Sequence, residues 1–312
     1  MQKFNTFSML EIIKILKKQL LQISAKDVLE FEVMNPDYLS SVYSGQQIEI
    51  EGELFIYRGY KAWVDLAQIL YCRMLTPIVI SQIKVIIKFE KLNEDDSFHR
   101  QITQKEEKYG SDSIFSQIHK NEETSFIAHY LKALQNVDIN KRTRILNLGV
   151  NSGDEFDIIL EYASNFKNLE LVGIDYCASA VKEAKEKFHE YSNIDIFLHD
   201  INELNSLNFE KFDLIISIGT LQSSNLEFNK LLMSIVQNQL KREGAMILGF
   251  PNCRWIDGEM IYGARVKNYA FSEMGLLFKD VIFAKKYLQQ KKFRVTITGK
   301  DYIFLTATSI VK

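Results

Sequence analysis

The sequence predicts an α/β protein: a mostly parallel sheet with a C-terminal antiparallel hairpin, preceded by a smaller α+β domain. From residue 141 onwards, short β-branched runs alternate with stretches of helical periodicity. This alternation is typical of a parallel sheet that carries helices on both faces. At the end, residues 293–298 and 302–309 form two strand-like runs that are joined by Gly299-Lys300-Asp301. Strands joined by so short a turn must be antiparallel.

The first 97 residues predict the smaller α+β domain, of unknown role. Their apolar positions change between helical and alternating spacing, and the polar stretch 93–97 is the expected linker. Residues 98–140 predict a mainly helical segment that links the domains and caps the active site, with a break at 109–112. The expected helices of the first domain are 4–22 and 60–75, and its expected strands are 29–33, 47–57 and 82–89.

In residues 141–312, the expected boundaries of each strand and helix come from changes in the spacing of the apolar residues. The expected strands before the final hairpin are 144–150, 169–174, 194–198, 212–218 and 245–250. The expected helices are 156–166, 178–191, 228–240 and 272–290.

Composition excludes several classes of protein. No apolar run approaches the roughly 18 residues of a membrane span, and the amphipathic N-terminus is unlike a signal peptide. The three cysteines are odd in number and far apart, which argues against a disulfide framework and favours a cytoplasmic location. No Cys/His spacing indicates a metal site. The net charge of −2 provides no overall attraction to nucleic acid.

The turn after the strand at 144–150 is the first motif that carries chemistry. Its glycines, Gly149 and Gly153, let a backbone bend sharply and approach a ligand closely. The helix that opens near Asp154-Glu155 presents free amides at the same turn. Glycine-containing turns of this kind are common, so the turn alone is weak evidence for a ligand site.

Two acidic residues strengthen the case because they end the next two strands. Asp175 follows Gly153 by 22 residues, enough for one helix and one returning strand, and it can bind two ribose hydroxyls. Asp200 ends the strand at 194–198, where it can accept a hydrogen bond from an adenine amino group while Ile201 packs against the ring. The alternatives are a helix N-cap for Asp175 and a surface turn for Asp200.

Together these residues resemble the class I S-adenosylmethionine (SAM)-dependent methyltransferases, over residues 141–312. The family's Asp/Glu-x-Gly-x-Gly-x-Gly motif lies on Asn147-x-Gly149-x-Asn151-x-Gly153. Asn147 replaces the usual acid, and Asn151 replaces the middle glycine, a position where Asn tolerates left-handed geometry. The resemblance implies a Rossmann-like fold and S-adenosyl-L-methionine as cofactor. The cofactor-binding residues that it implies are Asn147, Gly149, Val150, Asn151, Gly153, Asp175, Tyr176, Asp200, Ile201, Ile218 and Gly219.

In this family the acceptor lies beyond the ends of the fourth and fifth strands, under an N-terminal cover. Here that position indicates residues 219–222, 252–269 and 109–130. The last two segments carry aromatic and charged side chains that a packed scaffold does not require. The catalytic candidates are His119, Asp257 and Tyr262, and the substrate candidates are Trp255 and Arg265. A structural histidine and a structural crossover are the alternatives for these two segments.

The expected function is methyl transfer to a small or medium-sized metabolite. One alternative is an RNA methyltransferase, for which the basic residues Lys279, Lys285, Lys286, Lys291 and Lys292 would continue the binding surface. The other is a non-catalytic SAM-fold binding or regulatory protein, which the loss of the acid at Asn147 favours. The sequence indicates neither the acceptor nor the oligomeric state.

Overall fold

The computed structural model describes residues 1–97, 107–223, 225–263 and 273–311. The chain forms two compact units. The first comprises Met1–Arg100 with Trp255–Ile261, and the second comprises Gln101–Arg254 with Tyr262–Lys312. In the parts that the structure describes, no helix is long and apolar enough to cross a membrane.

The first unit is a four-stranded sheet of order β1-β2-β6-β5 with a helical layer. Ser8 begins its first helix with a capping box, since Ser8 and Glu11 satisfy each other's backbone amides. Phe31 and Phe89 of the sheet pack with Trp63 of the second helix, all about 1% exposed or less. The elements are β1 (Gln2–Lys3), α1 (Met9–Leu20), β2 (Val28–Met34), β3 (Gln47–Ile50), β4 (Glu53–Ile56), α2 (Tyr60–Ile69), β5 (Cys72–Val79) and β6 (Lys84–Lys91).

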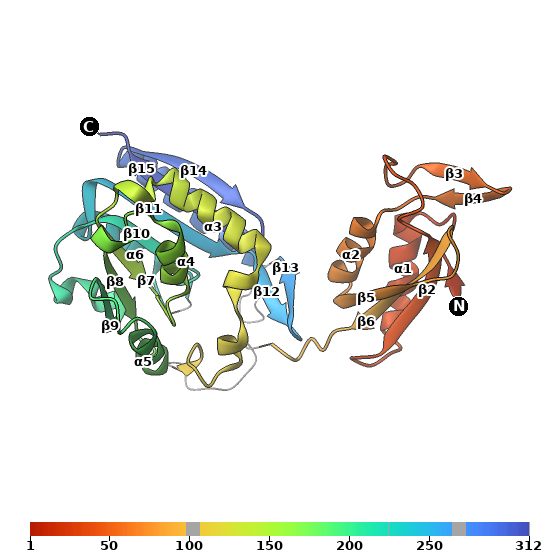
Figure 1. Ribbon diagram of the computed structural model, residues 1–312, viewed down its shortest axis with the longest axis horizontal. Helices are drawn as coiled ribbons and strands as arrows, with labels where there is room; N and C mark the ends of the chain where they lie inside the picture. The colour runs from red at the N-terminus through yellow and green to blue at the C-terminus, as the bar shows by residue number, and fades with distance from the viewer. Residues whose placement is uncertain (98–106, 224, 264–272, 312) are drawn as a thin grey trace. The chain divides into compact units, whose positions relative to one another are not determined.

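The second unit contains a seven-stranded sheet of order β14-β15-β11-β10-β7-β8-β9 (Figure 1). Five neighbouring strands of this sheet pair in parallel, namely β7 (Arg144–Leu148), β8 (Glu170–Asp175), β9 (Ile194–Leu198), β10 (Phe212–Ile218) and β11 (Leu240–Pro251). β14 (Phe293–Gly299) and β15 (Tyr302–Ser309) add an antiparallel hairpin beside β11. The predicted fold class is confirmed.

The strand order reverses at β7. The chain moves from β7 to β8 and β9 on one side, then crosses to β10 and β11 on the other. Connections that leave neighbouring parallel strands in opposite directions open a crevice at their carboxyl ends, where ligands of such sheets bind. The topology therefore places the candidate site at the ends of β7 and β10.

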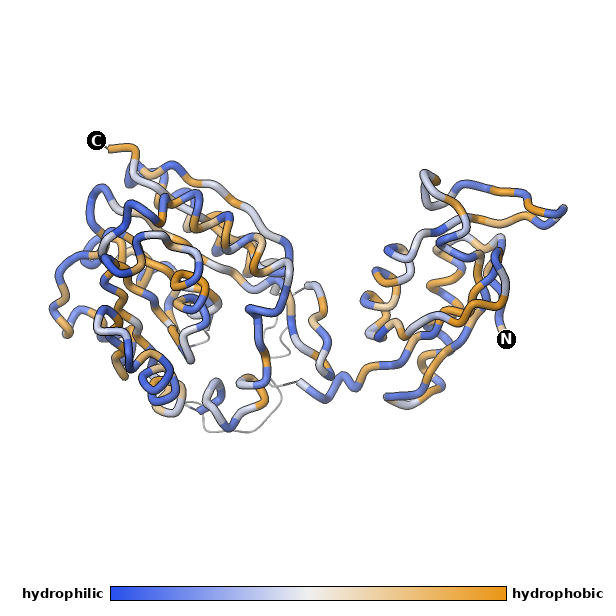
Figure 2. The backbone as a smooth tube through the Cα atoms, viewed as in Figure 1, coloured by the Kyte–Doolittle hydropathy of each residue, from blue (hydrophilic) through white to orange (hydrophobic). Residues whose placement is uncertain are grey.

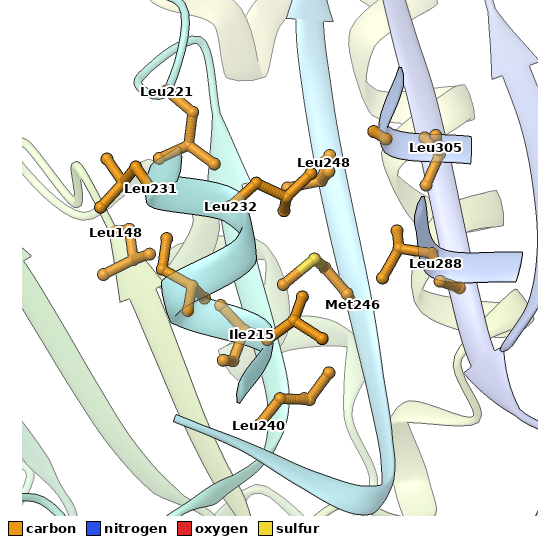
Figure 3. Packing of buried hydrophobic residues seen from close by; sticks show 14 of the residues in the cluster. Leu148, Ile215, Leu221, Leu231, Leu232, Leu240, Met246, Leu248, Leu288 and Leu305 are labelled. Atoms are coloured by element: carbon orange, nitrogen blue, oxygen red, sulfur yellow. The ribbon is translucent and has the colours of Figure 1, made fainter. Parts of the chain in front are cut away.

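Helices cover both faces of this sheet. One face carries α3 (Thr124–Asn136), α4 (Asp154–Tyr162) and α5 (Ala178–Lys187). α3 packs on β14 and β15, and hydrophobic residues alternate with hydrophilic ones along it (Figure 2). The other face carries α6 (Phe228–Asn238) and α7 (Glu273–Gln290), and Figure 3 shows leucines from α6, α7 and the strands meeting there. Short 3-10 helices complete the unit: η3 (Ile114–Gln117), η4 (Lys120–Glu122), η5 (Ile139–Lys141), η6 (Phe166–Asn168) and η7 (Ile201–Leu207).

Three expectations about secondary structure need correction. Helical spacing at 60–75 extended α2 too far, because β5 begins at Cys72. Residues 107–123 form turns and short 3-10 helices rather than a long helix, which begins only at Thr124. Within 252–263, the chain forms a hairpin of β12 (Cys253–Ile256) and β13 (Glu259–Tyr262), an element that the mixed composition did not indicate.

Leu248 tests the packing of the large sheet. This residue of β11 is 0% exposed, and its side chain lies near that of Leu232 of α6 (Figure 3). Leu248→Ala should lower the free energy of unfolding by about 2–5 kcal/mol, because it removes apolar contacts and leaves a cavity. The measurement is urea denaturation, with Leu198→Ala as the matched control, since Leu198 is 53% exposed. That control should stay within about 0.5 kcal/mol of wild type. Equal effects of the two variants would contradict the core described here.

Candidate functional site

The turn between β7 and α4 requires left-handed backbone at three positions. Gly149 and Gly153 have φ of +77° and +91°, and Asn151 has φ of +46°. Asn is among the few residues with a side chain that visit this region readily. The replacement of the family's middle glycine by Asn151 is therefore compatible with the shape of the turn.

This turn lies very close to its neighbours. A Cβ added to Gly149 would lie 1.9 Å from Thr220 Oγ1, just after β10, and one added to Gly153 would lie 2.2 Å from the Phe188 ring. Both glycines were expected to have no room for a side chain, and the groups nearest to them are side chains of the protein itself. The turn is thus held between the end of β10 and the end of α5.

Asp175 ends β8 beside the same turn. Its Oδ2 accepts a hydrogen bond from the Asn151 backbone N–H, and its Oδ1 accepts one from that of Cys177, both at 2.9 Å. The residue is only 7% exposed. Burial raises the pKa of this carboxyl above its ordinary value, and the two backbone hydrogen bonds partly oppose that shift. Asp175 therefore holds the glycine turn and the start of α5 together, and its binding of a ribose stays a prediction.

The position of the family's acid, Asn147, is fully buried in β7. Its Nδ2 donates a hydrogen bond of 3.2 Å to Glu155 Oε2. Glu155 lies in the first turn of α4, is 1% exposed, and accepts a second hydrogen bond of 2.8 Å from Lys120 Nζ. Lys120 also lies 3.7 Å from Asp154 Oδ2. Sequence reasoning missed Glu155 and Lys120, because an acid at a helix N-terminus has an ordinary explanation in the helix dipole.

The remaining cofactor candidates lie along the carboxyl edge of the sheet. Val150 is fully buried, and Tyr176 is 36% exposed. Asp200 caps η7, accepting a 2.8 Å hydrogen bond from the Asn202 backbone N–H, while the neighbouring Ile201 is buried in the core. Ile218 ends β10, and the Gly219 that follows it has φ of +74°.

Residues 107–123, the covering segment, are fastened to this edge. Asn151 Nδ2 donates to the Tyr109 carbonyl at 2.7 Å, and the Ser111 N–H donates to Ser179 Oγ at 3.1 Å. At the other end, Asn121 Nδ2 donates to the Asp154 carbonyl at 3.1 Å. The segment therefore contacts the glycine turn and the starts of both following helices.

A pocket of about 110 Å³ lies between the covering segment and the glycine turn. Tyr109 and Phe115 line it and meet edge to face, with ring centroids 5.0 Å apart. His119, an exposed residue before η4, is the one catalytic candidate that lines it. The other lining residues are Gly110, Ser111, Ser116, Ile118, Asn151, Ser152, Asp154, Glu183 and Lys187.

The residues that line this pocket include none of residues 252–263, and the expected substrate role of that segment stays a prediction. Trp255 and Asp257 belong to the first unit. There the Asp257 carboxylate pairs with Lys26 at 2.5 Å and accepts a 2.9 Å hydrogen bond from the Asn93 backbone. Burial raises the pKa of Asp257, but these partners outweigh burial and leave it below its ordinary value. Asp257 is thus occupied in structural contacts and is a poor candidate for a general base.

Two further candidates come from this segment. Tyr262 ends β13, is 50% exposed and is not among the residues that line the pocket, whereas Arg265 lies outside the described residues. Burial raises the pKa of the Cys253 thiol to about 12, so it stays protonated at neutral pH and is a poor nucleophile. Within the described ranges, no three His, Cys, Asp or Glu side chains come close enough to hold a metal ion.

A sheet of this order, with a glycine turn at its switch point and an acid ending the next strand, defines a class I SAM-dependent methyltransferase fold. The family model described as a methyltransferase domain matches residues 139–296, about half of the chain. The chain therefore belongs to the methyltransferase domain family, and S-adenosyl-L-methionine is the cofactor of this class.

Curated relatives include the carboxy-S-adenosyl-L-methionine synthases of Helicobacter pylori strains Shi470 and HPAG1. Each is 26% identical over 159 residues, which cover 49% of this chain and 63% of the relative. The match thus spans less than two thirds of those relatives.

Solved structures with similarity include the CurJ carbon methyltransferase, which is 18% identical with a TM-score of 0.42. The match covers 68% of this chain and 59% of that one. Precorrin-6y C5,15-methyltransferase from Geobacter metallireducens GS-15 is 10% identical with a TM-score of 0.40, over 58% of this chain and 88% of that one.

Asp175 allows a direct test of the cofactor site. Asp175→Ala removes a carboxylate that can accept charge-assisted hydrogen bonds from a ribose, so SAM affinity should fall by about 1.5–3 kcal/mol. Isothermal titration calorimetry measures the change, and Asp195→Ala, at an exposed acid in β9, is the control. Wild-type affinity in Asp175→Ala would show that the site is misplaced.

Proposed function

We propose that this chain transfers a methyl group from SAM to a small or medium-sized metabolite, which binds between the covering segment and the glycine turn. The pocket at this position carries the proposal. Tyr109, Phe115 and Ile118 give it an apolar wall, and hydroxyl groups and His119 add polar groups that can orient an acceptor. Its charged lining is mixed, since Asp154 and Glu183 accompany Lys187, and it does not form the basic surface that a phosphate backbone requires.

The cofactor fits the residues that are present. The left-handed turn offers backbone without side chains at Gly149 and Gly153, and Asp175 provides a carboxylate at the end of β8. The buried Asn147 Oδ1 has no hydrogen-bond partner among the described residues. When bound, SAM supplies a methyl group on a positively charged sulfur, which is displaced in line by the acceptor. The protein then has to align the acceptor and exclude water from it, tasks that suit a partly covered pocket.

Charge at the carboxyl edge favours a metabolite over RNA. Burial raises the pKa of Tyr302 well above its ordinary value, and the nearby carboxylates of Glu155, Asp154 and Asp301 raise it further. Glu155 and Asp301 are buried, so Asp154, whose side chain is 24% exposed, is the acid of these three that a phosphate backbone would meet. The five lysines expected for RNA are exposed but lie on α7 and the turn after it, whereas the covering segment joins the α3 and α4 side. They do not continue the pocket surface.

Transfer of a labelled methyl group tests the proposal. The full chain is incubated with cell extract and SAM that carries a deuterated methyl group, and the small-molecule and RNA fractions are analysed by mass spectrometry. We expect the label in the small-molecule fraction, because the pocket suits that size of acceptor. Ribonuclease-sensitive label in the RNA fraction would support the RNA alternative. SAM binding without any labelled product would support the non-catalytic alternative.

His119 is the residue in this pocket that can act as a general base for the acceptor. A positioned base accelerates proton transfer by about 10²–10⁴-fold, so His119→Ala should lower kcat by about 10²-fold with SAM affinity unchanged. Turnover and calorimetry on the same samples separate the two quantities. His189→Ala is the control, since His189 is exposed on the C-terminal side of α5. An unchanged kcat in His119→Ala would show that the acceptor needs no base from this residue.

A further inference from the structure

Three polar side chains from different elements meet beneath the glycine turn: Asn147 of β7, Glu155 of α4 and Lys120 of η4. Asn147 is 0% exposed and Glu155 is 1% exposed, while the Lys120 side chain retains 15%. Glu155 Oε1 accepts from Lys120 Nζ at 2.8 Å, and Glu155 Oε2 accepts from Asn147 Nδ2 at 3.2 Å. A buried charge is tolerated only where such partners surround it.

The hydrogen bonds of this cluster are incomplete on one side. Asn147 Oδ1 is buried and has no donor among residues 107–223, 225–263 and 273–311. The hydroxyl of Tyr130, a residue that is also 0% exposed, has no partner in the same ranges. Burial raises the pKa of Tyr130 well above its ordinary value, and the charge of Glu155 adds to that shift. Buried polar groups in native proteins are nearly always hydrogen-bonded, so an orphaned acceptor beside a carboxylate indicates a missing donor.

The charges are incomplete as well. Asp154 lies beside the cluster, with its Oδ2 3.7 Å from Lys120 Nζ and its side chain 24% exposed. Glu155 and Lys120 balance each other, so the cluster and Asp154 together carry a formal charge of −2 + 1 = −1. A ligand that carries both a positive charge and N–H donors would complete the charges and the hydrogen bonds together. A sulfonium has the charge but no N–H, so it satisfies only the first need.

The same geometry explains why position 147 is an amide. With Asn147 Nδ2 only 3.2 Å from Glu155 Oε2, an aspartate there would place two carboxylates in contact. Two carboxylates so close cannot both be ionised without a large cost. Asn147 and Glu155 are therefore complementary: this chain carries on the helix the carboxylate that its family carries on the strand.

We propose that Asn147 and Glu155 together form the acceptor pair for the α-ammonium group of SAM, with Glu155 supplying the negative charge that position 147 lacks. The inference rests on the proposed use of SAM and deepens it. It gives Glu155, a buried residue of α4, a binding role outside the glycine motif. It also removes the main reason for a non-catalytic protein, since the missing acid is replaced nearby.

Two ligands that differ in the amino-acid part test the proposal by calorimetry on the full chain. S-adenosylhomocysteine carries the α-ammonium without the sulfonium, and 5′-methylthioadenosine lacks the whole amino-acid part. Glu155→Gln should lower the affinity for S-adenosylhomocysteine by about tenfold or more, because the substitution removes a charge-assisted hydrogen bond. Its affinity for methylthioadenosine should stay within about twofold of wild type. Glu161→Gln, at an exposed acid of the same helix, should change neither value.

A charge exchange provides the second variant and keeps the test valid if Glu155→Gln folds poorly. Asn147→Asp with Glu155→Gln returns the carboxylate to the strand and the amide to the helix, so it should recover S-adenosylhomocysteine affinity to within about threefold of wild type. Asn147→Asp alone should lower the melting temperature, since it brings two carboxylates together.

The outcomes separate the two proposals. If the wild-type chain binds neither SAM nor S-adenosylhomocysteine, the proposed function itself is contradicted. If wild type binds, three results would overturn the acceptor pair: an unchanged affinity in Glu155→Gln, an equal loss for both ligands, or a folded double variant no better than the single one. An equal loss would mean that Glu155 only supports the fold.

Discussion

The site depends on how closely the backbone between β7 and α4 approaches the ends of the neighbouring strands. At Gly149 a single added carbon would collide with Thr220, and Asp175 binds the Asn151 amide from the other side. The left-handed conformation at three positions of the turn is what makes this approach possible. Because β7 lies where the strand order reverses, the same turn also borders the crevice that the sheet topology creates.

Charge is distributed around this turn in an unusual way. The strand position that the family gives to an acid carries an amide, and the carboxylate comes from Glu155 at the start of α4. Lys120 brings a compensating charge from the covering segment, so the ion pair also fastens that segment to the helix. Burial works to lower the pKa of Lys120, but the attraction of Glu155 and Asp154 outweighs burial and raises it, which keeps the ammonium charged. In the acceptor pair that we propose, cofactor binding and attachment of the covering segment would share the same carboxylate.

The hairpin of β12 and β13 shows how a polar segment can resemble a substrate loop. Asp257 and Glu259 have the composition of a reactive loop, yet both pair with basic residues of the first unit, Lys26 and Arg73. Ile256 and Ile261 are buried against Leu92 of the same unit. Packing between segments that are far apart in sequence therefore accounts for these charged and apolar residues, while the substrate role expected of Trp255 and Arg265 stays a prediction.

The sequence by itself determined the order of strands and helices from residue 141, the final hairpin and the position of the glycine turn. These features follow from local periodicity and from backbone conformations that few residues adopt. Local pattern also predicted that Asp175 ends its strand beside that turn. It could not reveal that Glu155 is buried against Asn147, that Lys120 neutralises it, or that Asp257 belongs to the other unit. Such contacts join residues from different elements, and hydrogen bonding and charge compensation between them exist only once the tertiary structure removes those groups from water.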